Sequence, residues 1–393
     1  MSDFMLSPEL EEFRSEVRKV ADKAFAPKAA HWDRTGQFPE ENRKLLADLG
    51  YTGLTISEEY GGSGGGPLQA AVCVEEIARA CVNTGVIAQV YLNNVPSHVE
   101  KLGSTELKRR FLPKYVSGEY FSNISITEAG AGSAWSDLRT TANIVGDDVV
   151  LNGSKCFFTL GHVLTHALVV VRFGSSVGAN GIGAVLVPRE APGLTVGPVN
   201  SKMGLRGIGD VDLFFDNCRV PVENILVEGT VDSTESFKTL IGGFGMERIG
   251  IAAQAVGVAD GAFWFAKRYT EERTQFGRPI CEFQGLQWKI ADMATQIHAA
   301  RLMTYHAASD YGAKGKADPQ LAAMAKLYAS EMVQRVTNDA IQLCGHYGYT
   351  TDAPLERMYR DARNWGLAGG SMEVMRNTIA SRIYGRRFDR RAS

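Results

Sequence analysis

The pattern of apolar and polar positions changes character twice along the chain. Over about the first 120 residues, apolar positions recur at three- and four-residue steps in short segments separated by glycine and proline, which is typical of amphipathic helices. Ser7, Pro8 and Glu9 indicate a helix start, because they supply a cap, a proline in the first turn and an acid that favours the helix dipole. The predicted helices of this part span residues 8–25, 41–49, 68–80, 85–92, 96–102 and 105–115.

Short apolar runs with glycine and asparagine between them replace this pattern after Gly118. Such runs predict strands with turns at their ends. Because no long helix separates the runs, the predicted sheet is mostly antiparallel, and it ends near Val227. The predicted strands span residues 148–153, 167–171, 183–187 and 211–215.

Helical periodicity returns at Ser233 in four long segments, 235–270, 284–311, 318–344 and 371–384. Their comparable lengths and short connections predict an antiparallel bundle. The longest segment carries an apolar stripe, and its glycines leave thin positions where neighbouring helices can approach closely. The fold class predicted from the whole pattern is α with a small β domain. Its parts are an N-terminal helical domain (1–122), a middle antiparallel β domain (123–230) and a C-terminal four-helix bundle domain (231–393).

The composition narrows the functional classes. The 393 residues include 42 Lys and Arg against 44 Asp and Glu, a net charge of −2, so no broad basic field for nucleic acid is expected. The six cysteines are scattered without a CxxC pair, which favours free thiols in a reducing cytoplasm and predicts no metal site. The first residues resemble neither a secretory signal nor a transit peptide, and no apolar run reaches membrane-spanning length. We therefore expect a cytoplasmic protein with no membrane span.

Seven short motifs follow one another along nearly the whole chain. They are ITEAGAGS at 126–133, KCFFT at 155–159, KMGLRG at 202–207, CRVP at 218–221, RTQFGRPICEFQ at 273–284, QLCGHYGY at 342–349 and YRDAR at 359–363. The ordered series resembles the motifs of the acyl-CoA dehydrogenases. This resemblance implies the fold of that family, an FAD cofactor, an acyl-CoA substrate, a homotetramer, and transfer of electrons to electron transfer flavoprotein.

The motifs of the middle domain suit the FAD that the resemblance implies. The hydroxyls of Thr127, Ser133 and Thr159 can hydrogen-bond to the edge of the isoalloxazine ring. Phe157 stands where the family usually has a tryptophan, so it can pack on the ring but cannot donate an N–H.

The motifs of the C-terminal domain serve, by resemblance, the FAD of a neighbouring subunit. Arg273 suits the pyrophosphate, and Phe276 and the 342–346 loop accompany it. His346 replaces a family glycine in this loop. The residues that the resemblance places at the cofactor are Ile124, Ile126, Thr127, Gly132, Ser133, Phe157, Phe158, Thr159, Arg273, Gln275, Phe276, Phe283, Gln284, Gln342, Gly345, His346, Ser371 and Glu373.

The base in most of the family is a glutamate in the motif YEGTSEIQR near the C-terminus. Residues 368–376 read AGGSMEVMR here, so Gly369 occupies the glutamate position. The isovaleryl- and long-chain acyl-CoA dehydrogenases also lack it there and carry it on a bundle helix directly before an arginine, which Glu247 and Arg248 match. The resemblance thus implies Glu247 as the base, the Gly369 N–H as a donor to the thioester oxygen, and Arg248 and Ser133 as substrate contacts.

Dehydrogenation requires a carboxylate that takes a weakly acidic α-proton, and a desolvated pocket would raise the pKa of that carboxylate toward neutrality. Glu247 has a simpler interpretation, as an acid near the positive end of a helix dipole that pairs with Arg248. Gly245 stands where the family has an acid that contacts pantetheine, which predicts a pocket of altered shape, suited to a branched or ring-bearing acyl group. We expect residues 87–95 to form part of its wall.

Three functions are compatible with these residues. The first is an FAD-dependent acyl-CoA dehydrogenase. The second keeps the flavin and the thioester but changes the chemistry, as in an enoyl-thioester reductase or in a desaturase or oxidase of carrier-protein-bound acyl groups. The third is a catalytically silent flavin-binding subunit of a hetero-oligomer, and Glu247 argues against it.

Overall fold

The computed structural model describes residues 6–386 and Phe388. The N-terminal part is helical, as predicted, but the first predicted helix is not uniform. It is an α-helix only to Val20, and residues 21–25 form a π-helical turn before Pro27 restarts the chain. The helices of this part are α1 (Pro8–Val20), α2 (Ala29–Thr35), α3 (Glu40–Asp48), α4 (Pro67–Ala80), α5 (Val82–Asn93), α6 (Val95–Leu102) and α7 (Thr105–Val116).

The middle part is a single sheet with the strand order β6-β7-β3-β2-β4-β5-β8, and β1 pairs with β4 outside this path. Only the pairs that β4 makes with β1 and β2 are parallel, which confirms the prediction of a mostly antiparallel sheet. The short strands β1, β2, β6 and β8 were not predicted, because three to five residues show too little alternation. The strands are β1 (Ser122–Ser125), β2 (Thr141–Val145), β3 (Asp148–Thr159), β4 (His166–Phe173), β5 (Ile182–Pro188), β6 (Leu194–Val196), β7 (Asp210–Pro221) and β8 (Ile225–Val227).

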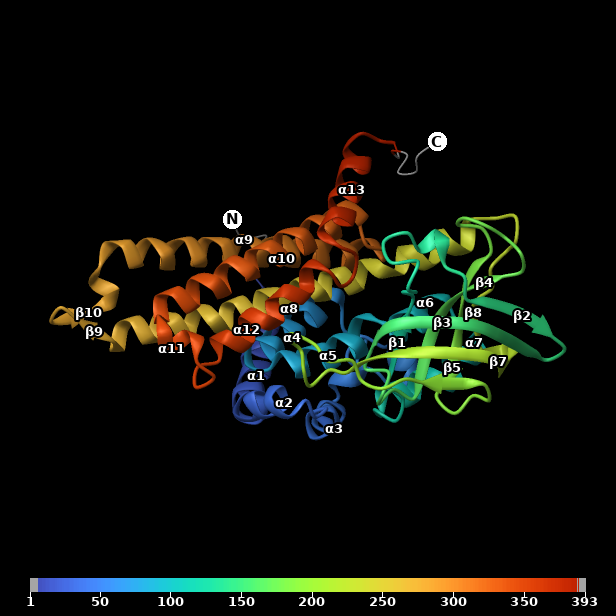
Figure 1. Ribbon diagram of the computed structural model, residues 1–393, viewed down its shortest axis with the longest axis horizontal. Coiled ribbons are helices and arrows are strands. Elements are labelled where there is room, and N and C mark those ends of the chain that lie inside the picture. The colour runs from blue at the N-terminus through green and yellow to red at the C-terminus, as the bar shows by residue number, and fades with distance from the viewer. Residues whose placement is uncertain (1–5, 387, 389–393) are drawn as a thin grey trace.

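The C-terminal part is built on three long helices that lie side by side, with α13 rising away from them (Figure 1). Helix α13 packs on α10, whereas α4 from the N-terminal part lies along α8. A two-stranded hairpin, β9 (Thr274–Gln275) and β10 (Arg278–Pro279), connects the first two long helices at the far end of the bundle. The helices are α8 (Glu235–Glu272), α9 (Gln284–Lys314), α10 (Pro319–Cys344), α11 (His346–Tyr349), α12 (Leu355–Ala362) and α13 (Met372–Ile383).

Helix α8 packs against α4, α5, α9, α10 and α12. A Cβ atom on Gly257 would lie 2.2 Å from the Glu75 carbonyl oxygen of α4, so the glycine permits the two backbones to approach, as the thin positions predicted. By length and composition α8 could cross a membrane, but 78% of its most apolar window is buried inside the fold. It is therefore the core helix of this domain.

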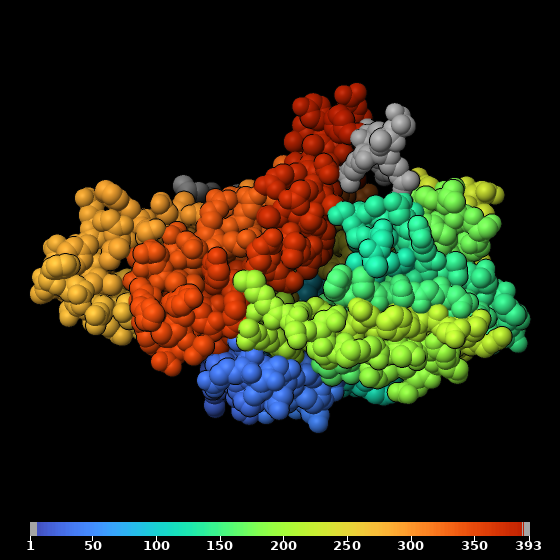
Figure 2. Space-filling view, viewed as in Figure 1, coloured from blue at the N-terminus to red at the C-terminus, as the bar shows by residue number. Residues whose placement is uncertain are grey.

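Two of the sequence motifs hold the sheet domain against the bundle. Asp361 Oδ1 of the YRDAR motif accepts a hydrogen bond from Leu205 N of the KMGLRG motif at 2.6 Å. Arg360 Nη1 donates to the Met203 carbonyl oxygen at 3.0 Å and to Asp33 Oδ1 at 3.0 Å. Above this junction, the surface is hollowed between the C-terminal segment and the teal and green sheet domain (Figure 2).

Candidate active site

Glu247 lies well inside α8 and not at its start. The helix begins at Glu235 and continues without a break through Gly242, Gly243 and Gly245. Neighbouring side chains pack directly on the glycines of this part of the helix. A Cβ on Gly243 would lie 2.3 Å from His98 Nε2, and one on Gly245 would lie 2.1 Å from Ala317 Cβ. The interpretation of Glu247 as an acid at the helix start is therefore wrong, since the dipole acts within the first turn.

Glu247 is half-buried, and one oxygen of its carboxyl group is shielded from solvent. Its Oε2 has no hydrogen-bond partner among the residues that the structure describes, and the same is true of the neighbouring Arg248 Nε. Burial raises the pKa of Glu247 to about 7, and the positive charges of Arg248 and Lys326 only partly oppose this rise. A carboxyl group with this pKa is half ionised near neutral pH, which suits it to take and release a proton.

Gly369 lies against the turn of α8 that follows Glu247, because the chain turns sharply between α12 and α13. Gly369 (φ 65°) and Gly370 (φ 93°) both adopt the left-handed region that favours glycine. A Cβ on Gly369 would lie 2.3 Å from Ile251 Cδ1, and Ile251 is one helical turn after Glu247. The Gly369 backbone therefore packs against α8 one helical turn after Glu247, the other residue to which the resemblance gave a catalytic role. Ser371 and Glu373 follow directly, with the Ser371 hydroxyl capping α13.

The loop after β1 is held by a buried ion pair that no sequence argument assigned. Lys155 Nζ, from β3, donates to the Ile126 carbonyl oxygen at 2.9 Å and to Glu128 Oε1 at 2.8 Å. Glu128 also accepts hydrogen bonds from the backbone N–H groups of Arg139 and Thr140. These contacts close the 126–140 loop on itself, which fixes the segment that carries Thr127, Gly132 and Ser133.

Phe157 is displayed on the surface by a bulge in β3. The pairing of β3 with β7 shifts between Lys155 and Phe158, and Phe157 takes a φ of 55°. As a result 67% of Phe157 is exposed, whereas Phe158 packs in the core with 3% exposed. The Phe158 side chain therefore lies in the core, away from the surface that displays Phe157. The Cys156 N–H donates to the Thr127 carbonyl oxygen at 2.8 Å, which places Thr127 beside this bulge.

The remaining predicted site residues around the bulge are only partly covered. Ile124, Ile126 and Thr159 are half-buried, whereas Gly132 and Ser133 are exposed. A Cβ on Gly132 would meet no atom within 4 Å, so the backbone here is open to a ligand.

The other predicted cofactor residues lie far away, at the opposite end of the molecule from the sheet domain (Figure 1). Phe276, at the tip of the β9–β10 hairpin, is 93% exposed. One copy of the chain therefore does not bring these residues to the bulge that carries Phe157. The residues of this distant group are Arg273, Gln275, Phe276, Phe283, Gln284, Gln342, Gly345 and His346.

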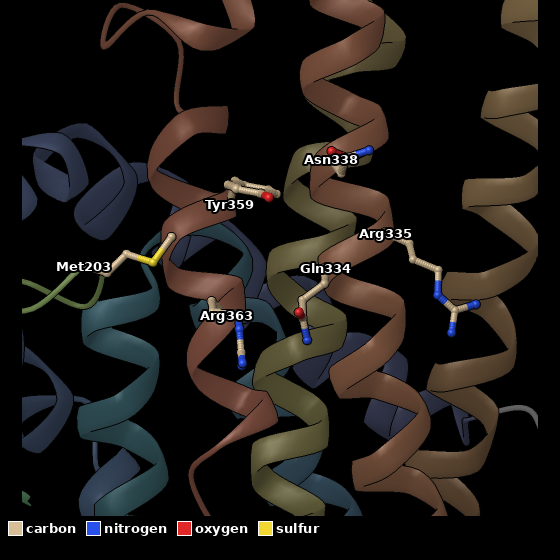
Figure 3. Close-up of a pocket in the computed structure, with 6 residues that line it drawn as sticks. All are labelled: Met203, Gln334, Arg335, Asn338, Tyr359 and Arg363. Atoms are coloured by element: carbon tan, nitrogen blue, oxygen red, sulfur yellow. The ribbon is translucent and has the colours of Figure 1, made fainter. Parts of the chain in front are cut away.

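A separate open pocket of about 270 Å³ lies between α10, α12 and the loop before β7 (Figure 3). None of its lining residues is among the predicted site residues, and Asn338 comes one helical turn before Gln342 on the same helix. The pocket is therefore distinct from the surroundings of Glu247. It is lined by Met203, Gln334, Arg335, Asn338, Tyr359 and Arg363.

Comparison with known proteins gives matches along the whole chain. Three family models match in succession: "Acyl-CoA dehydrogenase, N-terminal domain" over residues 7–119, "Acyl-CoA dehydrogenase, middle domain" over 123–218 and "Acyl-CoA dehydrogenase, C-terminal domain" over 237–384. The acryloyl-CoA reductase (NADH) of Anaerotignum propionicum is 39% identical over 384 residues, which cover 97% of this chain and 96% of that protein.

Two further similarities have the same extent. The short-chain specific acyl-CoA dehydrogenase of Clostridium acetobutylicum is 39% identical over 384 residues, which cover 97% of this chain and 100% of that protein. A chain in the solved structure described as "Electron transferring flavoprotein of Acidaminococcus fermentans: Towards a mechanism of flavin-based electron bifurcation" is 35% identical, with a TM-score of 0.93. The match covers 97% of this chain and 99% of that chain.

Proposed function

Because the chain belongs to the acyl-CoA dehydrogenase family, we propose that it oxidises an acyl-CoA thioester to the 2-enoyl-CoA, with Glu247 as the base. The observation that carries the proposal is the half-buried Glu247 carboxyl, whose pKa is raised to about 7 and whose shielded Oε2 has no protein partner among the described residues. FAD, when bound, supplies the acceptor for the hydride that leaves the β-carbon. Glu247 takes the α-proton, and the electrons of that C–H bond form the new double bond.

The Gly369 N–H is the proposed donor to the thioester oxygen. Negative charge develops on this oxygen as the α-proton leaves, and a fixed backbone donor stabilises it. Removing one such donor typically costs about 2.7–4 kcal/mol of transition-state stabilisation. The left-handed turn at Gly369 and Gly370 supports this role, because it brings the Gly369 backbone next to the α8 turn that follows Glu247.

The substrate contacts are proposed on both sides of this centre. Arg248 and Ser133 contact the CoA portion, and residues 87–95 of α5 and the start of α6 form part of the acyl wall. The acid that the family uses at position 245 has no room here, since a Cβ on Gly245 would lie 2.1 Å from Ala317 Cβ. This close approach supports a pocket of altered shape, and we propose a branched or ring-bearing acyl group for it.

The residues at the β3 bulge fit FAD. Phe157 offers an exposed aromatic ring for an isoalloxazine, Thr127 and Thr159 offer hydroxyls, and Gly132 leaves its backbone open. Arg273 and the exposed Phe276 would hold the ADP portion of the FAD of another subunit, which makes a homotetramer part of the proposal. Electron transfer flavoprotein is the proposed electron acceptor, and the similarity to the Acidaminococcus fermentans structure supports it. The cytoplasm is the proposed location.

A second candidate is the reverse reaction, reduction of an enoyl-thioester. The acryloyl-CoA reductase (NADH) of Anaerotignum propionicum favours it, because it is as similar to this chain as the dehydrogenase of Clostridium acetobutylicum is. Glu247 and Gly369 would serve that reaction as well, with Glu247 returning a proton to the α-carbon.

Anaerobic spectroscopy of the FAD-loaded protein separates the candidates. Bleaching of the flavin by one member of a panel of straight, branched and cyclic acyl-CoAs supports the dehydrogenase. Reoxidation of the dithionite-reduced protein by enoyl-CoAs, without bleaching by any acyl-CoA, supports the reductase. A flavin that responds to neither class, or only to carrier-protein thioesters, contradicts both assignments on CoA.

A further inference from the structure

Lys326 is a fully buried lysine that the reaction described above does not use. It lies on α10 with 0% of the residue exposed. The buried face of this helix is otherwise mostly apolar, and Ala322, Ala323 and Ala329 lie on it near Lys326. Burial of an ammonium group is costly unless hydrogen bonds and charges compensate it. Lys326 Nζ donates a hydrogen bond of 2.6 Å to the Gly370 carbonyl oxygen. The compensation therefore comes from the turn that carries Gly369.

The segment before this turn is braced from the same helix face. Ser330, one helical turn after Lys326, donates to the Trp365 carbonyl oxygen at 2.9 Å. Trp365 Nε1 donates to Gln254 Oε1 of α8 at 2.9 Å. The segment 365–370 is thus tied to α10 at both of its ends, and Lys326 is the tie at the end where Gly369 lies.

The charge of Lys326 also acts on the groups around it. Arg248 and Glu247 of α8 and Glu373 of α13 are the ionisable groups that influence Lys326. Burial lowers the pKa of Lys326 to about 8, so it is mostly protonated at neutral pH. In turn, its positive charge opposes the rise in the pKa of Glu247. One side chain therefore touches the backbone that carries Gly369 and acts electrostatically on the base.

We propose that Lys326 is a positioning residue of the reaction, which fixes the Gly369–Gly370 turn and sets the ionisation of Glu247 through its charge. The inference rests on the proposed function of Glu247 and Gly369. Lys326 contacts neither the reacting carbon atoms nor the base directly, and its effects reach the substrate through the peptide at Gly370 and through the electric field at Glu247.

The test compares four variants in the FAD-loaded protein. Lys326→Met removes the charge and the donor at similar volume, whereas Lys326→Arg keeps the charge but alters the geometry. Ser330→Ala removes a hydrogen bond to the same segment without changing any charge. Lys289→Met is the matched control, because Lys289 belongs to a partly exposed pair with Asp339 on the neighbouring helix.

Rates of anaerobic flavin reduction by the most reactive acyl-CoA are measured from about pH 5.5 to about pH 9. In the profile of rate against pH, we expect Lys326→Met to shift the rising low-pH limb to higher pH by about half a pH unit or more. We also expect it to lower the plateau rate at high pH about tenfold. Lys326→Arg should keep the limb near its wild-type position with a lowered plateau. Ser330→Ala should lower the plateau without moving the limb, and Lys289→Met should change neither. The inference is overturned if the pH–rate profile of Lys326→Met has the same low-pH limb and the same plateau rate as the wild type.

A second measurement does not depend on turnover or on the proposed function. Infrared difference spectra between acid and neutral pH report the protonation of Glu247 as the carboxyl signal that Glu247→Gln abolishes. Lys326→Met should shift the midpoint of this signal to higher pH, and an unshifted midpoint overturns the electrostatic part of the inference. If Lys326→Met does not fold with FAD, then Lys326→Gln, which loses only the charge and keeps a donor, takes its place in both measurements.

Discussion

At the scale of single residues, the account depends on the environment of Glu247. A glutamate directly before an arginine on a long helix has no unusual property by itself. The fold shields the Oε2 atom, leaves it without a protein partner among the described residues, and places Gly369, which has a positive φ, beside the next helical turn. Burial is the largest influence on its pKa, and the cations Arg248 and Lys326 are too weak to reverse it.

The pH dependence of the reaction follows from this environment. Only the ionised carboxylate takes a proton, so the second-order rate constant for flavin reduction should rise with pH through a pKa of about 7. The effect on stability has the opposite sign, because a raised acid pKa favours folding below the unfolded value of 4.5, and this contribution is lost as the pH rises to about 7. Stopped-flow reduction over this range measures the limb, and a limb near the ordinary glutamate pKa would contradict the assignment.

Moving the base back to position 369 requires a second change. Glutamate at Gly369 must adopt a left-handed backbone, at a cost of roughly 1–2 kcal/mol, and its Cβ would collide with Ile251 Cδ1 at 2.3 Å. Glu247→Gln/Gly369→Glu should therefore recover little activity, and adding Ile251→Val, which removes this Cδ1 atom, should raise the flavin reduction rate about tenfold or more. Ile251→Val alone is the control. If the double variant and the triple variant that adds Ile251→Val recover the same flavin reduction rate, then Ile251 does not block position 369.

At the scale of elements, a buried carboxylate joins the first helix to the rest of the fold. Glu76 of α4 is 1% exposed, and its two oxygens accept hydrogen bonds of 2.7 Å from Arg14 Nε and Arg18 Nε of α1. Burial tends to raise its pKa, but the hydrogen bonds and charges of the two arginines outweigh burial and lower it. The ion pairs are thus the main polar attachment of α1 to α4.

Replacement of this carboxylate should loosen the N-terminal helix. Glu76→Gln removes the anion that Arg14 and Arg18 contact most closely and that Arg79 also contacts, and it should reduce the free energy of unfolding by roughly 3 kcal/mol. The stability of the wild type that depends on Glu76 should be lost as the pH falls through and below 4.5, because its folded pKa lies below that value. Urea denaturation measures both effects, with the exposed Glu12→Gln on α1 as the control. A loss no greater than that of the control would refute the role.

Element type was largely predictable from periodicity, whereas several local features were not. The long helices and strands repeat the same spacing over many residues, but the four residues of β1 and the π-helical turn at 21–25 carry too little pattern to detect. The candidate base was found by its position before Arg248. Lys326 was missed, because a lysine among alanines is usually solvent-exposed and only the tertiary contact with Gly370 shows otherwise. The obstruction by Ile251 likewise depends on packing between distant segments.

At the scale of the whole molecule, the predicted cofactor residues at the β3 bulge and those near the β9–β10 hairpin lie at opposite ends of the molecule (Figure 1). Phe157 lies on the sheet domain, and Arg273 and Phe276 lie at the hairpin beyond the bundle. Both aromatic rings are largely exposed in the single chain. A site completed by a second copy accounts for this division, and this is the reason for proposing an oligomer.

Subunit mixing tests the shared site. Arg273→Ala and Phe157→Ala should each lower the FAD content of the purified protein. Hetero-oligomers of the two variants should regain FAD at about half of the sites, since one site then combines the intact Phe157 of one subunit with the intact Arg273 of the other. Flavin absorbance per chain measures the recovery. Hybrids that remain as depleted as the parent variants would indicate a site formed within one chain.

The most direct measurement of the central claim is the anaerobic rate of flavin reduction in Glu247→Gln with the acyl-CoA that bleaches the wild type fastest. The amide fills the same space but cannot take the α-proton, so the rate should fall by about 10²–10⁴-fold or more while the affinity for the acyl-CoA stays nearly unchanged. Glu271→Gln, an exposed glutamate on the same helix, should reduce its flavin at the wild-type rate. Reduction of the Glu247→Gln flavin at the wild-type rate would contradict the account, because Glu247 would then not be the base.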